Sequence, residues 1–205
     1  MIISYNHATQ PVATFVFAHG AGAGKDSDFM QWVAEGMASQ GISVARFNFA
    51  YMAEQVATGK KRPPQKMPHL LEQYQARINE VDPDMPIFIG GKSMGGRAAT
   101  LLLQESRAKG GICFGYPFHP PGKADKLRTE HLYALTKPLL IVQGERDTFG
   151  TQKEVEGYAL GANIQTRFLA DGDHSLKPRK VSGFSYPQHI QSAVDAAVNF
   201  IKAQL

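Results

Sequence analysis

Residues 86–104, PIFIGGKSMGGRAATLLLQ, change from a strand-like to a helix-like pattern within a few positions. Ile87-Phe88-Ile89 is a short apolar run before Gly90 and Gly91, which favours a buried strand of a parallel sheet. From Met94 onward, alanine and leucine predict an apolar helix. The junction reads G-x-S-x-G, a pattern in which glycines allow a sharp turn that projects the serine above the sheet. We therefore predict an exposed Ser93 hydroxyl at this turn.

The same five residues have a plainer interpretation, in which a glycine-rich loop enters a helix and Ser93 is its N-cap. Under the first interpretation, the Met94 N–H lies at a helix N-terminus and can stabilise an oxyanion. The two interpretations differ in whether an acid and a base follow later in the chain, each after a strand.

The rest of the chain alternates between apolar strand-like runs and amphipathic helical segments, without repeats or linkers. The expected strands are 1–6 (a short edge strand), 12–17, 42–49, 87–89, 111–116, 138–143 and 164–169. The expected helices are 28–40, 69–81, a helix from residue 94, 124–135, 151–160 and 187–205, with residues 50–67 irregular and 117–122 a rigid loop. This order predicts one α/β domain over residues 1–205. Its fold class is a three-layer α/β/α sandwich with a mainly parallel sheet of about six to seven strands.

Composition narrows the classes of function. The 205 residues carry a net charge of +4 and one cysteine, which excludes an internal disulfide. Cys113 lies in an apolar run and is expected to be a buried strand residue. No 18-residue apolar run or signal-peptide pattern is present, so we expect a cytoplasmic protein that does not enter the membrane. Lys60, Lys61, Arg62 and Lys66 are expected to form a solvated loop, since no nucleic-acid-binding motif accompanies them.

Two polar clusters follow the later strands. Asp147 comes after the strand 138–143, and His174 comes after the strand 164–169. The order Ser93, Asp147, His174 is typical of a catalytic triad on a parallel sheet, because the carboxyl ends of the strands meet at one edge. His174 would take the serine proton, and Asp147 would orient the imidazole. Glu145, Asp171 and Asp173 are alternative acids, of which Asp173 is disfavoured by its adjacency to His174.

Residues 19–25, HGAGAGK, follow the strand 12–17 and invite comparison with a phosphate-binding loop. They fail that pattern, because only three residues separate Gly20 from Gly24 and Asp26 follows Lys25. We predict instead that the Ala21 N–H completes an oxyanion hole with Met94. His19, Gly22 and His119 are expected to contact substrate. The seven histidines lack paired spacing, so neither a metal site nor a cofactor is predicted.

Five ordered motifs carry a family resemblance over nearly the whole chain: HGAGAGKDSDFM, GKSMGGR, GYPFHPPGK, GERDTFG and GDHSL. Together they resemble a branch of small α/β-hydrolases related to dienelactone hydrolases. This branch is also similar to a testis-expressed protein and to a subunit of the non-specific-lethal histone acetyltransferase complex. The resemblance implies an α/β-hydrolase fold and places the triad roles on Ser93, Asp147 and His174.

The chain departs from that family in two ways. Dienelactone hydrolases have a cysteine at the position of Ser93, and only about eleven residues precede the first firm strand. The segment between Tyr116 and Pro138 is too short for a lid domain, so an open site is expected.

From these features we predict a serine hydrolase acting on small soluble acyl substrates, either carboxylic esters or thioesters. The alternatives are a non-catalytic protein-interaction module on a hydrolase scaffold and a phosphate- or nucleotide-binding protein. The sequence predicts no oligomeric state, because the apolar stripe of the C-terminal helix is needed to dock that helix on the sheet.

Overall fold

The computed structural model describes residues 2–205 and contains one seven-stranded sheet in the order β1-β3-β2-β4-β5-β6-β7. The strands are β1 (Ser4–Asn6), β2 (Ala13–Ala18), β3 (Ile42–Phe47), β4 (Ile87–Lys92), β5 (Gly110–Phe114), β6 (Leu139–Gly144) and β7 (Ile164–Leu169). Six strands pair in parallel, and the edge strand β1 runs antiparallel to β3. The expected fold class is therefore confirmed.

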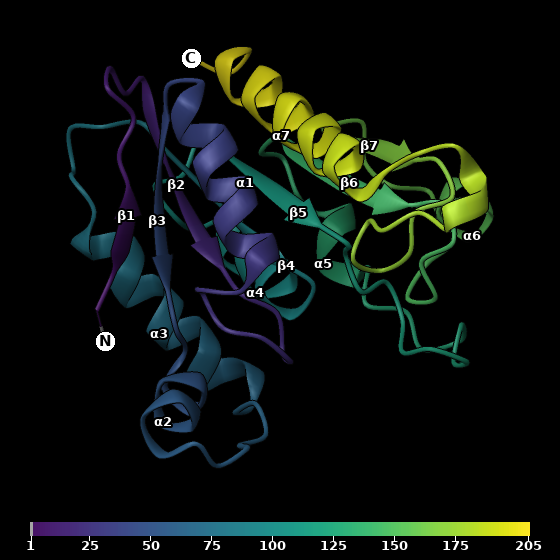
Figure 1. Ribbon diagram of the computed structural model, residues 1–205, viewed down its shortest axis with the longest axis horizontal. Helices are drawn as coiled ribbons and strands as arrows, with labels where there is room; N and C mark the ends of the chain where they lie inside the picture. The colour runs from purple at the N-terminus through teal and green to yellow at the C-terminus, as the bar shows by residue number, and fades with distance from the viewer. Residues whose placement is uncertain (1) are drawn as a thin grey trace.

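Helices cover both faces of the sheet (Figure 1). They are α1 (Asp28–Ser39), α2 (Ala50–Thr58), α3 (Met67–Glu80), α4 (Met94–Leu103), α5 (Glu130–Tyr133), α6 (Gln152–Glu156) and α7 (Tyr186–Lys202), with a 3₁₀ turn at Lys180–Ser182. One apolar core joins the sheet to α3 and α4, and a second joins its other face to α1 and α7. Strands β2 and β3 are buried along their whole length, as expected for strands covered on both faces.

Three expected elements differ from the structure. Residues 50–67 were expected to be irregular, but the helix α2 occupies the first nine of them, positions 50–58. The segment contains Gly59 and the pair Pro63-Pro64, which obscure the shorter helix before them; Gly59, at φ 69°, is its C-cap. The helices expected over 124–135 and 151–160 are shorter, because α5 has four residues and α6 has five.

The strand order reverses direction between β2 and β4. The chain leaves β2 toward β3 on one side and continues from β4 toward β7 on the other. Loops diverge at such a switch point and leave a crevice beyond the carboxyl ends of the strands. The loop after β2 and the turn after β4 are therefore neighbours, and both carry residues singled out in the sequence.

Tyr74 of α3 links these two central strands from beneath. Its buried hydroxyl accepts a hydrogen bond from the Gly90 N–H at 2.8 Å. The same oxygen lies 2.7 Å from the Val16 carbonyl oxygen and 2.6 Å from the Gly90 carbonyl oxygen. The hydroxyl thus satisfies buried backbone groups at the position where β4 approaches its turn.

Replacing Tyr74 by phenylalanine is expected to destabilise the fold by about 2 kcal/mol, because a buried N–H and carbonyl lose their partner. For a chain of this size the melting temperature should fall by about 4–8 °C in calorimetry. Tyr133→Phe, at a half-exposed tyrosine, is the matched control and should shift it by less than about 2 °C. Equal shifts in the two variants would contradict this assignment.

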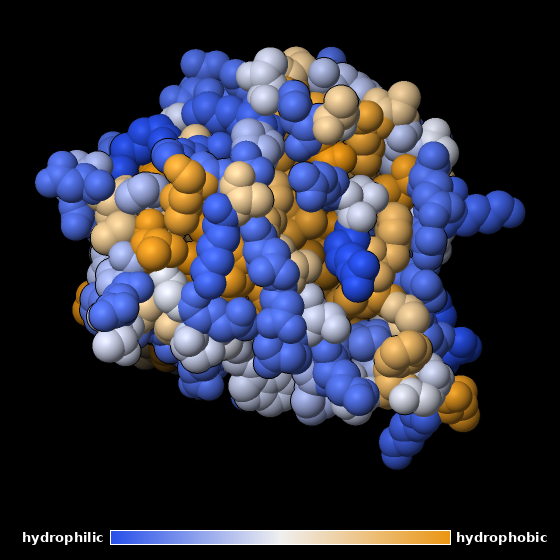
Figure 2. Space-filling view, turned by 90° about the horizontal axis from the view of Figure 1, so that it is seen from above, coloured by the Kyte–Doolittle hydropathy of each residue, from blue (hydrophilic) through white to orange (hydrophobic). Residues whose placement is uncertain are grey.

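The surface seen from above carries both hydrophobic and hydrophilic side chains. Figure 2 shows apolar residues in separate patches among hydrophilic ones. Across residues 2–205, no helix is long and apolar enough to cross a membrane.

Candidate active site

Ser93 sits at a sharp turn between β4 and α4. Its backbone has φ 50° and ψ −114°, a conformation that residues other than glycine rarely adopt. Such strain is characteristic of functional turns. Ser93 is the N-cap residue of α4 by position, yet its side chain makes no capping hydrogen bond. The plain N-cap interpretation of this serine is therefore wrong.

The flanking glycines are required by close backbone packing. A Cβ on Gly91 would lie 2.4 Å from the Gly95 carbonyl carbon, and one on Gly95 would lie 2.5 Å from the Ala18 carbonyl oxygen. These separations are too short for any side chain. The turn thus packs directly against the end of β2, which brings the loop that follows β2 next to Ser93.

The structure brings Ser93, His174 and Asp147 into one hydrogen-bonded chain. The Ser93 Oγ lies 2.8 Å from His174 Nε2, and His174 Nδ1 lies 2.8 Å from Asp147 Oδ2. A carboxylate can only accept, so Nδ1 carries the proton and Nε2 is free to accept the proton of the serine hydroxyl. This is the geometry in which a base can activate a serine.

Asp147 is fully buried and held on every side. Its Oδ1 accepts the Phe149 N–H at 2.8 Å, and its Oδ2 accepts the Gln143 side-chain N–H at 2.8 Å. The Tyr116 backbone N–H donates to Gln143 Oε1 at 2.8 Å, which fixes the orientation of the Gln143 amide. Sequence reasoning missed Gln143, whose only signal is a polar residue at the end of an apolar strand.

The alternative acids have other partners. Asp173 caps its own turn by accepting the Ser175 and Lys177 N–H groups. Glu145 accepts the Asp171 N–H, and Asp171 is paired with Arg146 and Arg179. These contacts stiffen the loop that carries His174.

Two packing contacts set the position of the imidazole. The Phe149 ring stacks on it with a centroid distance of 4.2 Å. Gly144 lets the His174 loop approach, because a Cβ there would lie 2.3 Å from the Asp173 carbonyl oxygen. The loops after β6 and β7 therefore interlock at this point.

The predicted oxyanion donors lie on the two adjoining segments. Met94 is the first residue of α4, and its N–H has no hydrogen-bond partner among residues 2–205. In the loop after β2, the backbone carbonyls of Gly20 and Ala21 are hydrogen-bonding partners of the Tyr51 hydroxyl. This hydroxyl lies 3.3 Å from the Gly20 oxygen and 3.1 Å from the Ala21 oxygen. Tyr51 belongs to α2, the helix that sequence reasoning missed.

His19 and His119 were expected to contact substrate, and the structure corrects both expectations. His19 is fully buried, donates from Nδ1 to the Gly20 oxygen at 2.6 Å and accepts the Phe49 N–H at Nε2. Burial lowers the pKa of His19 to about 4, so this imidazole is neutral and shapes its loop.

His119 is also buried, at 3 % exposed. Its Nδ1 lies 2.9 Å from the Pro120 oxygen, and its backbone N–H donates to the Phe149 oxygen. It therefore supports the residue that stacks on His174 and does not line the cavity.

A cavity of about 580 Å³ opens beside Ser93 and His174. Gly22, the third expected substrate contact, does line it, together with Ala21. Its walls carry four aromatic side chains, from Phe29, Trp32, Phe149 and Tyr186. The space thus suits an apolar organic group held close to the serine.

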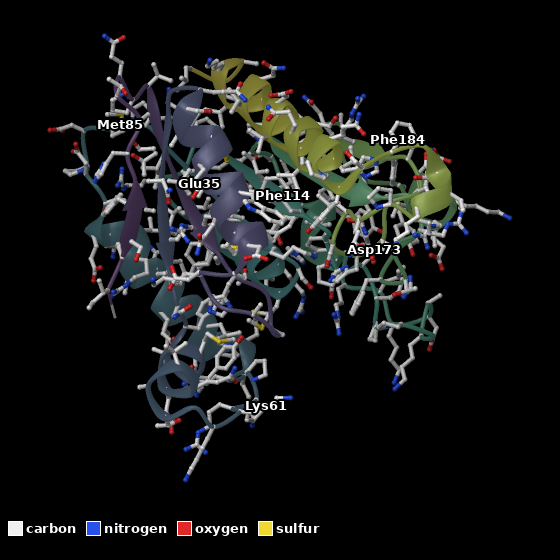
Figure 3. All side chains as sticks on the ribbon, viewed as in Figure 1. Glu35, Lys61, Met85, Phe114, Asp173 and Phe184 are labelled. Atoms are coloured by element: carbon white, nitrogen blue, oxygen red, sulfur yellow. The ribbon has the colours of Figure 1, made fainter. Side chains whose placement is uncertain are left out.

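The site has no cover domain within the part of the chain that the structure describes. Between β5 and β6 the chain forms loops and the single helical turn α5. The basic loop after α2 lies elsewhere: Figure 3 places Lys61 well away from Asp173, the neighbour of His174. Lys25 and Arg62 are paired with Asp26 and Glu54.

Cys113 is buried on β5 as expected, and burial raises the pKa of its thiol. Among residues 2–205, no group of three or more histidine, cysteine or carboxylate side chains is arranged to hold a metal ion.

A family model described as alpha/beta hydrolase domain matches residues 11–202. Solved structures share the fold at low sequence identity. Est1E from Butyrivibrio proteoclasticus, solved with ferulic acid, has a TM-score of 0.75 and 15% identity over 99% of this chain and 94% of its own. A dienelactone hydrolase from Anabaena variabilis has a TM-score of 0.71 and 15% identity over 98% and 90%.

XC6422 from Xanthomonas campestris, described as an α/β serine hydrolase without a lid, has a TM-score of 0.67 and 14% identity over 99% of this chain and 88% of its own. That description of XC6422 is in line with the loops and the single helical turn α5 found between β5 and β6 in this chain. The resemblances to the testis-expressed protein and to the histone acetyltransferase subunit stay predictions.

Proposed function

Because this chain belongs to the alpha/beta hydrolase domain family, we propose that it is a serine hydrolase that cleaves carboxylic esters or thioesters of small acyl groups. The observation that carries the proposal is the chain of two 2.8 Å contacts from Ser93 through His174 to Asp147. A serine in a strained turn, hydrogen-bonded to an oriented histidine, is suited to nucleophilic attack.

The reaction begins when Ser93 Oγ attacks the acyl carbon and its proton passes to His174 Nε2. The Met94 and Ala21 N–H groups stabilise the oxyanion of the tetrahedral intermediate. His174 then returns the proton to the departing alkoxide or thiolate as the bond to the acyl carbon breaks. This leaves an acyl group on Ser93.

Water completes the cycle. His174 takes a proton from a water molecule that attacks the acyl-enzyme, and the Ser93 oxygen recovers that proton as the acid departs. Asp147 stabilises the imidazolium in both halves of the reaction. The residues suffice for this chemistry without a cofactor, and the site is proposed to work on a small-molecule substrate.

Fluorophosphonate labelling tests the proposal directly. The folded protein is expected to gain the mass of one adduct, mapped by peptide sequencing to Ser93, and the heat-denatured protein should gain none. A panel of p-nitrophenyl esters and acyl thioesters then compares acyl lengths. A folded protein that neither labels nor turns over any member of the panel would refute the hydrolase and favour the protein-interaction module.

A further inference from the structure

Lys92 is a half-buried cation that the proposed reaction does not use. It is the last residue of β4, directly before Ser93, and it lines the cavity. Its Nζ donates to the backbone oxygen of His174 and lies 5.8 Å from the centroid of the Phe29 ring. Within residues 2–205 it forms no ion pair with a carboxylate inside 4.0 Å.

Such an arrangement is unfavourable for folding alone. An ammonium group partly removed from water without a bonded counter-ion costs free energy, and an apolar side chain of similar length would fill the same space without that cost. Burial lowers the pKa of Lys92 to about 8, partly offset by the charges of Asp147 and Asp173. A role in the site accounts for a charge that folding does not require.

The local geometry is shaped around this ammonium group. Gly115, in the turn after β5, has φ 65° and passes close to both partners of the contact. A Cβ on Gly115 would lie 2.8 Å from Lys92 Nζ and 2.7 Å from the His174 oxygen. Three segments, from β4, β5 and β7, therefore meet at one hydrogen bond (Figure 3 shows Phe114 and Asp173 on two of them).

We propose that Lys92 is a positioning residue that holds the backbone of His174, and so keeps its imidazole within hydrogen-bond distance of Ser93. The inference rests on the proposed function of Ser93 as a nucleophile. Lys92, which precedes Ser93 at the end of β4, thereby sets the distance between the Ser93 hydroxyl and the His174 imidazole. An error of about 1 Å in such a distance can cost on the order of 10²-fold in rate.

Several charged or titratable groups face this ammonium group. Asp147 follows β6, and Asp173 and His174 follow β7. Asp28 of α1 and Tyr186 of α7 line the same cavity as Lys92, and burial raises the pKa of Tyr186 to about 12. Lys92 is thus the group expected to lose its charge near pH 8, and a neutral amine is a weaker donor.

The test compares Lys92→Met with Lys109→Met, the same change at an exposed lysine before β5, at the opposite end of the strands. Lys92→Met should lower kcat by about 10²-fold with KM changed less than about threefold, and its melting temperature should stay close to wild type. Lys92→Gln, which keeps an N–H donor, should recover part of kcat. The fall of kcat above about pH 8 in the wild type should be absent in Lys92→Met.

Proton NMR of the His174 Nδ1–H provides a readout that needs no turnover. Its downfield resonance should be sharp in the wild type and broadened by exchange in Lys92→Met. If the wild type is not labelled by fluorophosphonate but the NMR spectra of wild type and Lys92→Met still differ as expected, Ser93 is refuted as the nucleophile while the positioning role of Lys92 stands. Unchanged kcat and NMR in Lys92→Met would overturn that role, as would a loss of kcat explained by unfolding.

Discussion

Ser93→Ala is expected to lower kcat for ester hydrolysis by about 10⁴- to 10⁶-fold and to abolish the fluorophosphonate adduct. The side-chain oxygen is the atom that forms the acyl bond, and no other hydroxyl lies on His174 Nε2 among the described residues. Hydrolysis of p-nitrophenyl acetate by purified wild-type and variant protein gives the ratio. Retention of a tenth or more of wild-type kcat would exclude Ser93 as the nucleophile.

Stability gives a second, independent arm of this experiment. Ser93→Ala keeps the strained φ of 50°, so its free energy of unfolding should change by less than about 1 kcal/mol. Ser93→Gly removes the strain as well as the hydroxyl, and it should be more stable than the wild type by about 1 kcal/mol while equally inactive. Urea denaturation measures both. An inactive Ser93→Ala that is also unfolded would give no support to the nucleophile.

The sequence predicted the parts of this protein that depend on local patterns. Six strands read as apolar runs, and α1 reads as an amphipathic helix ended by Gly41. The loops after these strands follow from topology, since parallel strands end at one edge of a sheet. That rule sufficed to place Ser93, Asp147 and His174 near one another.

What the sequence did not predict depends on contacts between distant segments. His19 and His119 follow strands just as His174 does, and only packing shows that their nitrogens point into the protein. Gln143 and Tyr51 are ordinary residues by local pattern. Their roles follow from the fold, in which Gln143 donates to the Asp147 carboxylate and the Tyr51 hydroxyl donates to the Gly20 and Ala21 carbonyls.

Lys92 illustrates the same limit from another side. In the sequence Lys92 occupies a variable position of G-x-S-x-G, at which the pattern specifies no residue type. In the fold its ammonium group reaches a carbonyl 82 positions later in the chain. Long-range hydrogen bonds of this kind are set by the mutual approach of loops, which local propensity does not encode.

Asp147→Asn is expected to lower kcat by about 10⁴-fold with little change in fold, because an amide in place of the carboxylate disturbs the tautomer of His174. If the amide oxygen faces the Phe149 N–H, the amide NH₂ faces His174 Nδ1 and moves the imidazole proton to Nε2. Nε2 then cannot accept the Ser93 proton. If the amide flips, its NH₂ opposes the Phe149 N–H, and the buried pocket loses a hydrogen bond.

Asp173→Asn is the matched comparison, since it changes the neighbouring carboxylate on the His174 loop. Its amide oxygen can still accept the Ser175 and Lys177 N–H groups, so we expect less than a tenfold loss of kcat. Steady-state kinetics on both variants, with circular dichroism to check folding, separates the two acids. A larger loss in Asp173→Asn than in Asp147→Asn would assign the orienting carboxylate to Asp173. It would also imply that the 2.8 Å contact between Asp147 and His174 is not the one used in catalysis.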